Sequence, residues 1–308
     1  MGRITVLGSY NLDLAAAVPR FPAPGETLHA HSLLRGHGGK GSNQAVAAAR
    51  AGAAVRFAGC IGQDDAGQGA RMLWQAEGIE DQAVARRGLP TGLALILIDA
   101  AGENQIVIVA GANHAVDQAE AAAAGALAPG DIALAQLEVP LPATLAFLAA
   151  ARGAGATTVL NAAPAQAALP RALLAATDIL VVNEGEAAML CGTPDGAGPT
   201  LARRVARAVV VTAGAQGAFL FQQDGAAWHQ PTSPVQVGDT TGAGDAFVGA
   251  FSAALARAAP LPEALADGVA AGGLACTQAG AVAALPHSDA ITARRATLPA
   301  AKQTQRSA

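Results

Sequence analysis

The amino-acid sequence predicts an α/β fold in which a mostly parallel central sheet carries helices on both faces and a small β-lid lies beside it. The first observation is that short apolar runs alternate with Ala-rich helical stretches, as in parallel strands joined by crossover helices. The second is the length of 308 residues, close to the size at which one hydrophobic core stops growing. The third is a pair of extended segments that no crossover helix of their own follows. Residues 1–308 are therefore expected to form a single domain with a lid.

The strands of the central sheet are expected where short apolar runs are bounded by turn residues. These runs are Ile4–Leu7, Val55–Ala58, Ile132–Ala135, Thr158–Leu160, Ile179–Val182, Val209–Val211 and Ala218–Phe221. Helices are expected to begin near Gly41, Ala66, Pro142, Glu184, Gly242 and Pro262. Strand and helix thus alternate along most of the chain.

The lid is expected from two stretches that break this alternation. Gly25–Leu34 and Thr91–Val109 are extended segments with turn residues, and the second contains the turn sequence Asp99-Ala100-Ala101-Gly102. We expect residues of about 10–36 and 90–110 to form the lid. Its strands offer exposed edges that a second subunit could cover, so a homodimer through the lid is expected.

Composition excludes several classes of protein. Hydrophobic residues make up 52% and charged residues 14%, which excludes a disordered chain, and the net charge of 19 − 23 = −4 leaves no basic footprint for nucleic acid. The 19 uncharged residues Gly268–Pro286 are rich in Gly and Ala, so they predict a buried helix and loop instead of a membrane span. After Arg3 no signal-peptide apolar region follows, and the three cysteines form no C-x-x-C pair. A cytoplasmic location is expected.

The most informative segment is the Gly-rich turn that runs from Val237 to Phe247 and leads into an Ala-rich helix. Free N–H groups of Gly242, Ala243 and Gly244 would lie at the helix N-terminus, which favours a phosphoryl group. Asp245 would then lie beside the phosphate, where a carboxylate can accept a proton from an attacking hydroxyl. The alternative is an ordinary acidic residue that stabilises the first turn of a helix.

A second polar group lies near the N-terminus. Asn11 and Asp13 follow the first strand, and Gly38-Gly39-Lys40-Gly41-Ser42-Asn43 opens a helix. A carboxylate that accepts from neighbouring hydroxyls, with Lys and Asn donors, suits a polyhydroxylated sugar. The spacing Gly36-x-Gly38-x-x-Gly41 matches the dinucleotide fingerprint formally, but it follows a lid segment and no strand-ending acidic residue lies about 20 positions on. We therefore favour the sugar interpretation.

With these motifs the chain resembles the PfkB family of carbohydrate kinases, and within it the ribokinase branch. The matching segments occur in order along nearly the whole chain: Asn11-x-Asp13, Phe21-Pro22-x-Pro24-Gly25-Glu26-Thr27, Gly38 to Ala49, Gly111-Ala112-Asn113, Gln136-Leu137-Glu138, Asn161-x-x-Pro164-Ala165, Asn183-Glu184-x-Glu186, Thr212-x-Gly214-x-x-Gly217 and Asp239 to Asp245. The Gly-Gly-Lys-Gly-x-Asn-Gln block indicates the ribokinase branch. The resemblance implies a three-layer ribokinase-like fold.

The resemblance also implies an activity. ATP would transfer its γ-phosphoryl to the primary 5-hydroxyl of D-ribose, giving D-ribose 5-phosphate and ADP, with Asp245 as general base and Gly242 to Gly244 as the anion hole. The implied sugar ligands are Asn11, Asp13, Gly39, Lys40, Asn43 and Glu138. The alternatives are a kinase of deoxyribose, another pentose or a nucleoside, or a non-catalytic sugar- or nucleotide-binding regulator.

Cofactor residues are implied in the same way. Asn183 and Glu186 would position magnesium through water, and Thr212, Gly214 and Gly217, with Asn183 and Gly244, would bind the nucleotide. An activating potassium ion would be held by Asp239, Thr241, Cys276, Ala279 and Ala281, mostly through carbonyl oxygens. Ala284 stands where some relatives have a hydroxyl residue, so one side-chain oxygen is missing from that site.

Overall fold

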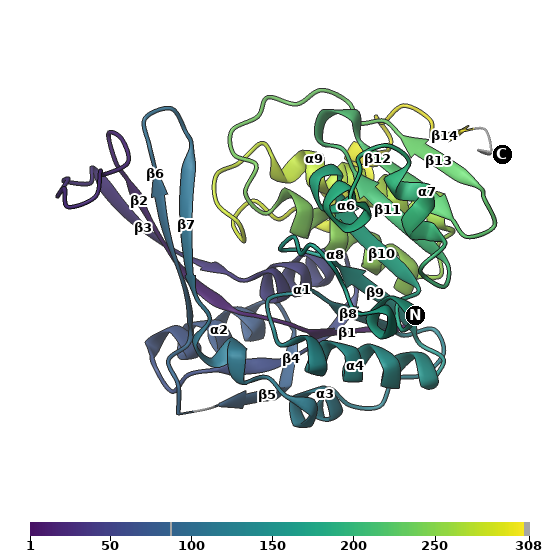
Figure 1. Ribbon diagram of the computed structural model, residues 1–308, viewed down its shortest axis with the longest axis horizontal. Coiled ribbons are helices and arrows are strands. Elements are labelled where there is room, and N and C mark those ends of the chain that lie inside the picture. The colour runs from purple at the N-terminus through teal and green to yellow at the C-terminus, as the bar shows by residue number, and fades with distance from the viewer. Residues whose placement is uncertain (87, 305–308) are drawn as a thin grey trace.

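A computed structural model describes residues 1–86 and 88–304 of the chain. In this part of the chain a ten-stranded sheet forms the centre of the molecule (Figure 1). Its strands, in spatial order, are β14 (Lys302–Thr304), β13 (Ala227–Gln230), β12 (Ala218–Gln222), β11 (Ala208–Thr212), β10 (Ile179–Asn183), β9 (Thr157–Asn161), β8 (Ile132–Ala135), β1 (Arg3–Leu7), β4 (Ala54–Ile61) and β5 (Glu80–Arg86). The strands from β5 to β11 pair in parallel, and β12 to β14 are antiparallel.

The central strands are buried on both faces, which explains their continuous apolar sequences. Successive residues of a strand point to opposite faces. In β10, Ile179 and Val181 belong to one hydrophobic cluster, while Leu180 and Val182 belong to the other. The sheet therefore separates two cores.

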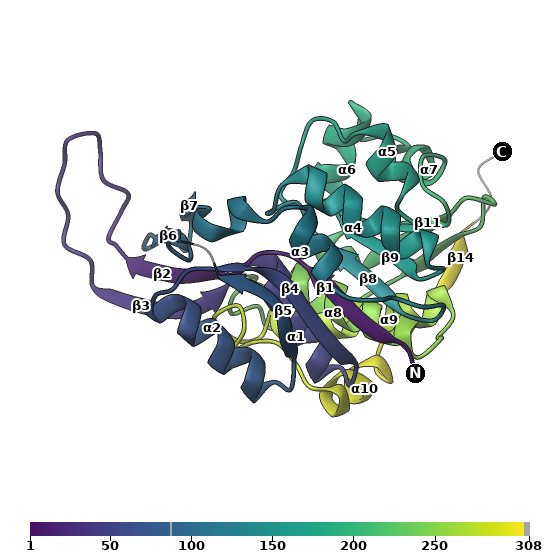
Figure 2. The same cartoon turned by 90° about the horizontal axis from the view of Figure 1, so that it is seen from below.

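Helices cover both faces of this sheet, and Figure 2 shows the two layers on opposite sides of it. One core receives side chains from α1 (Lys40–Arg50), α2 (Asp65–Ala76), α8 (Ala243–Ala256), α9 (Leu261–Ala275) and α10 (Ser288–Arg295). The other receives them from α3 (Gln118–Ala123), α4 (Leu141–Gly153), α5 (Arg171–Ala175), α6 (Glu184–Cys191) and α7 (Ala197–Ala202). Two short 3₁₀ turns, η1 (Gly111–Ala115) and η2 (Gly214–Gln216), complete the layers.

Helices α1 and α8 pack closely because small residues line their contact. A Cβ on Gly249 would lie 2.4 Å from the Cβ of Ala47, so only glycine fits there. This contact is important for the site, because the first turns of α1 and α8 carry the Lys40-to-Asn43 motif and Asp245. Alanine and glycine thus set the distance between the two polar motifs.

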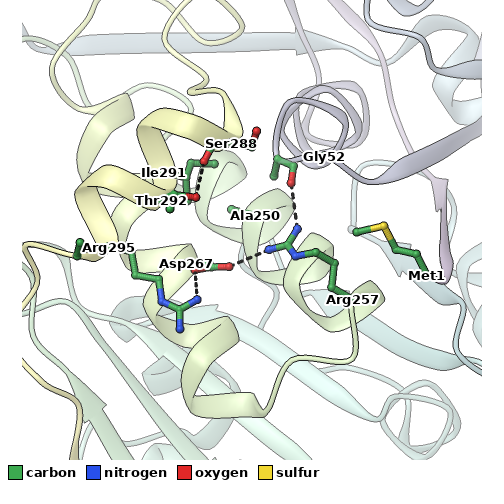
Figure 3. Close-up of a pocket in the computed structure, with 11 residues that line it drawn as sticks. Met1, Gly52, Ala250, Arg257, Asp267, Ser288, Ile291, Thr292 and Arg295 are labelled. Atoms are coloured by element: carbon green, nitrogen blue, oxygen red, sulfur yellow. Dashed lines mark hydrogen bonds and ion pairs between the residues drawn. The ribbon is translucent and has the colours of Figure 1, made fainter.

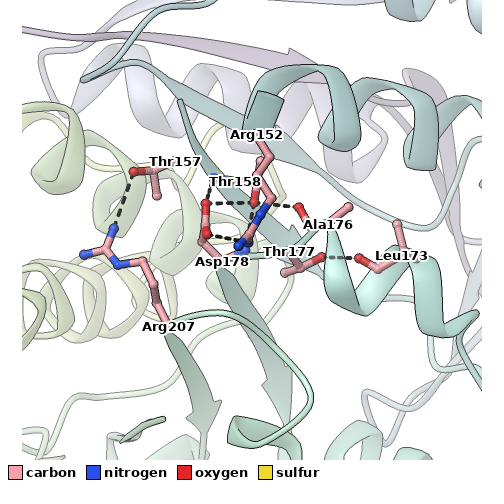
Figure 4. Close-up of polar contacts among 8 residues, drawn as sticks. All are labelled: Arg152, Thr157, Thr158, Leu173, Ala176, Thr177, Asp178 and Arg207. Carbon is pink, nitrogen blue, oxygen red and sulfur yellow. Dashed lines mark hydrogen bonds and ion pairs between the residues drawn. The ribbon is translucent and has the colours of Figure 1, made fainter. Parts of the chain in front are cut away.

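Two clusters of ion pairs, each centred on a buried aspartate, hold the layers together away from these motifs. Asp267 on α9 accepts from Arg257 and Arg295 at 2.9 Å each, beside a cavity of about 690 Å³ (Figure 3). Both guanidinium groups are engaged there, so the cluster is a structural tie between α9, α10 and the end of α8. Asp178 accepts from Arg152 at 2.8 Å and from the backbone N–H of Thr158 at 2.9 Å, which fixes β9 beside the start of β10 (Figure 4).

A four-stranded sheet extends from the body (Figures 1 and 2). Its order is β3 (Ser32–Gly38), β2 (Asn11–Ala17), β6 (Gly92–Ile98) and β7 (Asn104–Val109); β2 and β6 are parallel, and the outer pairs are antiparallel. We call it the small sheet. The segment Thr91–Val109 is extended with a turn at Asp99, as expected, and forms a hairpin; Oδ1 of Asp99 accepts from the N–H groups of Ala101 and Glu103.

The prediction for Gly25–Leu34 is only partly right. Just Ser32–Leu34 belong to a strand, and residues 18–31 form the loop between β2 and β3. This loop contains Pro22, Pro24 and Gly25, and the φ of Gly25 is +82°. Such residues favour a turn and disfavour a hydrogen-bonded β-strand.

Elsewhere the predicted pattern is close to the structure. Each predicted strand overlaps an observed one, and each predicted helix start lies within one residue of the observed start. Strands β5, β13 and β14 and the short helices α3, α5, α7 and α10 were not predicted. Within the described residues no helix is both long and apolar enough to cross a membrane, and Gly268–Ala275 lies in α9 as expected.

Candidate active site

The carboxyl ends of the parallel strands meet the first turns of α1 and α8, as expected for a ligand site in an open α/β sheet. A cavity of about 210 Å³ lies there. Its polar lining is Lys40, Asn161, Asn183, Glu186, Thr212, Thr240 and Asp245, together with Gly242 and Gly244. These residues come from parts of the sequence that are up to about two hundred positions apart, and the fold brings them to one edge.

The first turn of α8 has the geometry of an anion site. Gly242 precedes the helix with φ +77°, and no side chain caps the helix. The first N–H groups of a helix have no partner within it, so they remain for a ligand. Ala243 differs from the prediction, because its N–H donates to the carbonyl oxygen of Thr240 at 3.2 Å. The free donors expected at this turn are therefore those of Gly242 and Gly244.

Asp245 is buried, at 7% exposure, and its side chain is held by α1. Oδ1 accepts from Nε2 of Gln44 at 2.8 Å, and Oδ2 accepts from Nδ2 of Asn43 at 3.0 Å. A carboxylate that only stabilised its own helix would not need two buried amide donors from another helix. The geometry favours the reactive interpretation of Asp245.

The expected sugar ligands lie around the first turn of α1. The Asp13 carboxylate packs so close to Gly38 that a Cβ there would lie 2.2 Å from its oxygen. Oε2 of Glu138 accepts from the backbone N–H of Lys40 at 2.8 Å and from the hydroxyl of Ser9 at 2.5 Å. The Glu138 carboxylate is thus anchored by the backbone of the motif, and the Asp13 carboxylate lies directly against it.

Two buried asparagines belong to the same set of predicted sugar ligands, and we call the place where these ligands gather the sugar pocket. Oδ1 of Asn11 accepts from Asn113 at 2.8 Å, so the amide N–H₂ of Asn11 is the group left for a ligand. Asn43 has the opposite arrangement: its N–H₂ donates to Asp245, and its buried Oδ1 has no partner among the described residues. The pocket therefore offers one amide donor and one amide acceptor, as a polyol requires.

The charges of the site are coupled. Burial, helped by Glu138 and Asp245, raises the pKa of Asp13 to about 6. Burial works against the charge of Lys40, but the carboxylates of Asp245, Glu138 and Glu186 outweigh it and raise the pKa of the ammonium. Lys40 consequently stays a cation among carboxylates, where it can meet an anionic substrate.

A second cavity, of about 510 Å³, adjoins the first and shares Thr212, Thr240 and Gly244 with it. Of the residues predicted to bind the nucleotide, Thr212, Gly214, Gly217 and Gly244 line it. Sequence reasoning gave no role to other lining residues, which include Val235, Val237, Phe247, Val269 and the pair Gly272–Gly273. An apolar slot that opens onto the α8 turn suits a nucleotide whose base lies in the slot and whose phosphates reach Gly244.

Asn183 and Glu186 lie beside the phosphate end of this path. Asn183 is the N-cap of α6, and Glu186 lies three residues on, in the first turn of that helix. Its Oδ1 accepts from the N–H of Glu186, and Oε2 of Glu186 accepts from the N–H of Asn183, both at 2.8 Å. One Glu186 oxygen remains outside this capping box. Burial raises the pKa of Glu186 against the opposing effects of the Asn183 N–H and Lys40.

The two loops expected to hold potassium lie against each other. Oδ2 of Asp239 accepts from the N–H of Gly280 at 2.9 Å, and its Oδ1 accepts from the N–H and hydroxyl of Thr241. The carbonyl of Cys276 already accepts from Gly238 at 2.8 Å and from Asp239 at 3.3 Å. The two loops are therefore in contact, as a shared ion would require. The carbonyl oxygen of Cys276 already accepts two backbone hydrogen bonds and is less available to a cation.

Sequence reasoning gave no role to several residues that organise this site. They are Ser9, Gln44, Asn113, Gln136 and Asn161. Four of them lie in segments that carry the family resemblance, and that was the available signal. Their contacts join positions about 30 to 200 residues apart, which local spacing does not reveal.

A model of the pfkB family of carbohydrate kinases matches residues 1–288. The chain belongs to this family. It is 37% identical to the ribokinase of Haemophilus influenzae over 292 residues, which cover 92% of this chain and 95% of that one. It is 33% identical to the deoxyribokinase of Salmonella typhi over 258 residues, which cover 81% and 84%.

A solved structure also matches. The ribokinase of Arabidopsis thaliana, complexed with ribose and ATP, superposes with a TM-score of 0.85 at 29% identity and covers 96% of this chain and 99% of that one. The ribokinase-like α/β fold expected from the sequence is confirmed, and so is the enzyme class. The protein is a carbohydrate kinase with ATP as its co-substrate.

Proposed function

We propose that the protein transfers the γ-phosphoryl group of ATP to the 5-hydroxyl of D-ribose, with Asp245 as the general base. The observation that carries this proposal is the position of Asp245. It lies in the uncapped first turn of α8 and is held by Asn43, whose own Oδ1 has no partner among the described residues. Relatives that are named as ribokinases, and one structure with ribose and ATP, support ribose as the acceptor.

The reaction follows from this placement. Asn11, Asp13 and Asn43 bind sugar hydroxyls and direct the primary hydroxyl at Asp245. Asp245 accepts its proton, the oxygen attacks the γ-phosphorus in line, and the bond to ADP breaks. The N–H groups of Gly242 and Gly244, with the Lys40 ammonium, stabilise the charge on the transferred group. Loss of one such donor commonly costs about 10²–10³ in rate.

A panel of acceptors tests the substrate. We expect the highest kcat/KM with D-ribose, below it 2-deoxy-D-ribose and other pentoses, and the lowest values with nucleosides, measured as ADP release with Mg²⁺ and ATP. A preference for deoxyribose or a nucleoside would replace ribose as the substrate. Absence of ADP release with every acceptor would instead support a binding regulator.

Metal ions are proposed at two places. The free oxygen of Glu186 and the Asn183 side chain would hold Mg²⁺ through water, and Mg²⁺ would neutralise charge on the phosphates. Chelation of Mg²⁺ is expected to abolish turnover.

The loops at Asp239–Thr241 and Cys276–Ala281 would hold K⁺ through oxygen ligands, with Ala279 and Ala281 contributing carbonyls.

Potassium dependence is a separate prediction. We expect kcat to fall several-fold when K⁺ is replaced by Na⁺ or by tetramethylammonium at equal ionic strength, because a cation between the two loops orders the α8 turn. Ala284→Ser, which restores a hydroxyl, should lower the K⁺ concentration needed for half activation. Equal rates in all three cations would exclude the site.

The pH dependence of sugar binding follows from Asp13. Because its pKa in the free enzyme is about 6, it loses its acceptor character as the pH falls through that value. We expect kcat/KM for ribose to fall about tenfold per pH unit below pH 6. Because the pKa of Asp13 is higher in the folded protein than in the unfolded chain, the ionised carboxylate destabilises the fold. The free energy of unfolding contributed by Asp13 therefore increases as the pH falls from above 6 towards the pKa of the unfolded chain.

Asp13→Asn is the matching variant. It should have low kcat/KM at every pH and a free energy of unfolding at pH 8 that is at least that of the parent. The measurement is a set of ribose titrations and urea unfolding curves between pH 5 and 8. If kcat/KM for ribose falls below pH 6 in Asp13→Asn as it does in the parent, a group other than Asp13 causes that fall.

We further propose that the small sheet is the lid over the sugar and the surface of a homodimer. Register places Leu34, Ile98, Ile106 and Ile108 on the same face as Asp13, and all four are exposed, Leu34 at 67% and Ile106 at 51%. A second copy that covers this face would also close the mouth of the sugar pocket.

Light scattering tests the assembly. We expect a mass of twice 30.2 kDa for the parent and a shift to monomer for Ile106→Lys. Val107→Lys is the matched control, because Val107 is exposed on the opposite face of the same strand. A monomeric parent would exclude the dimer, and an effect of Val107→Lys alone would move the interface to the other face. The cytoplasmic location stays a prediction.

A further inference from the structure

Behind Asp245 lies a chain of buried side-chain amides that no step of the proposed reaction uses. Nε2 of Gln44 donates to Oδ1 of Asp245 at 2.8 Å and to Oδ1 of Asn161 at 2.9 Å. Its Oε1 accepts from Nε2 of Gln136 at 2.7 Å. Gln44 is fully buried and Gln136 is nearly so. Both N–H groups and the oxygen of the Gln44 amide are therefore engaged.

The Asp245 carboxylate, at the end of this row of amides, determines how each amide is oriented. An ionised carboxylate only accepts hydrogen bonds, so the Gln44 amide must turn its N–H₂ towards Asp245. Its oxygen then needs a donor on the far side, and Gln136 supplies it. The remaining Gln136 oxygen is buried without a hydrogen-bond partner among the described residues and lies where a side chain on Gly8 would clash, at 2.4 Å.

That unpaired oxygen is unfavourable, since a buried polar atom without a partner costs free energy. An alternative residue at position 136 could avoid the cost, but it would lose the donor that fixes Gln44.

Gln44 differs from Asn43, the other donor to Asp245. Asn43 also presents a free Oδ1 and belongs to the proposed sugar ligands. Gln44 has no exposed surface and is absent from the lining of both site cavities. Gln44 reaches the site cavity only through its hydrogen-bond partners Asp245 and Asn161, and Asp245 is the one that carries the reacting carboxylate.

We propose that Gln44 is the positioning residue of the catalytic base, oriented in turn by Gln136, which follows β8. The inference rests on the proposed function. By holding Oδ1, Gln44 fixes the plane of the Asp245 carboxylate while Asn43 holds Oδ2, so that a lone pair faces the incoming hydroxyl. Misplacement of a reacting group by about 1 Å can cost on the order of 10²-fold in rate.

The test is a double-mutant cycle with Gln44→Met, which keeps the volume and removes the amide. We expect kcat to fall about 10- to 100-fold with KM for ribose within about threefold of the parent. In an Asp245→Asn background the same substitution should have no further effect on kcat, because the group it positions is already lost. Gln44→Glu should move the acid limb of the kcat profile to higher pH, since two facing carboxylates resist joint ionisation.

Gln230→Met is the matched control. Gln230 is a buried glutamine that donates to the carbonyls of Pro231 and Pro299 at 2.9 Å, outside the site cavities. We expect it to lower stability and to change kcat by the same small factor in both backgrounds. If Gln44→Met does not yield folded protein, Gln136→Met takes its place, with a smaller loss of kcat that likewise vanishes in the Asp245→Asn background.

The outcomes are distinct. Unchanged kcat in Gln44→Met, or an equal loss in both backgrounds, overturns the positioning role and leaves the proposed function intact. Normal turnover in Asp245→Asn alone overturns the proposed base, and the inference with it.

Discussion

Asp245→Asn is expected to lower kcat for ribose phosphorylation by about 10²–10⁴ while KM for ribose changes only a few-fold. The amide has nearly the same shape as the carboxylate, but it cannot take the proton of the attacking hydroxyl. The pocket formed by Asn11 and Asp13 is untouched, so sugar binding persists. Initial rates of ADP release and ribose titration calorimetry measure the two quantities separately.

A buried aspartate elsewhere provides the control. Asp267 is as buried as Asp245, but its carboxylate pairs with Arg257 and Arg295 and lines neither site cavity. Asp267→Asn should lower the free energy of unfolding, because it weakens two charge-assisted bonds, and leave kcat per folded molecule unchanged. Equal kcat losses in both variants would mean that the Asp245 effect is structural.

The sequence was sufficient for the central sheet because its strands are buried on both faces. Val181 and Val182 must both be apolar when each faces a core, and such runs are visible without a structure. Strands at the edge of the sheet lack this constraint. β5 begins Glu80-Asp81-Gln82, and β14 is exposed, so neither has an apolar run to reveal it.

The candidate site was predictable in its parts but not in its connections. Local motifs located Asp245 and the Lys40 turn, because an anion turn and a helix start have local signatures. The Gln44–Asp245 bond joins residues 201 positions apart, and periodicity does not say which helices meet. The spacing Asn183-x-x-Glu186 is ambiguous for another reason, since a capping box and a metal element have the same pattern.

Gly39→Ala is expected to have the second-largest effect, on sugar binding and stability together. Gly39 precedes α1 with φ +85°, and a Cβ there would lie 2.7 Å from Cα of Tyr10 and 2.8 Å from the backbone nitrogen of Asn11. Both obstacles are backbone, so α1 and the start of β2 must move apart. Backbone strain and overpacking of about 1–3 kcal/mol each predict a combined loss of roughly 2–6 kcal/mol in the free energy of unfolding.

The displaced groups belong to the sugar pocket, which is why binding should suffer more than a general loss of stability explains. We expect KM for ribose to rise at least tenfold in the fraction of Gly39→Ala that folds, measured beside urea unfolding. Gly25→Ala separates strain from collision, because Gly25 has φ +82° with no atom within 4 Å of its Cβ position. It should lose some stability and keep KM. A normal KM in Gly39→Ala would mean that the first turn of α1 adjusts without disturbing Asn11, and that the pocket is not built on this close contact.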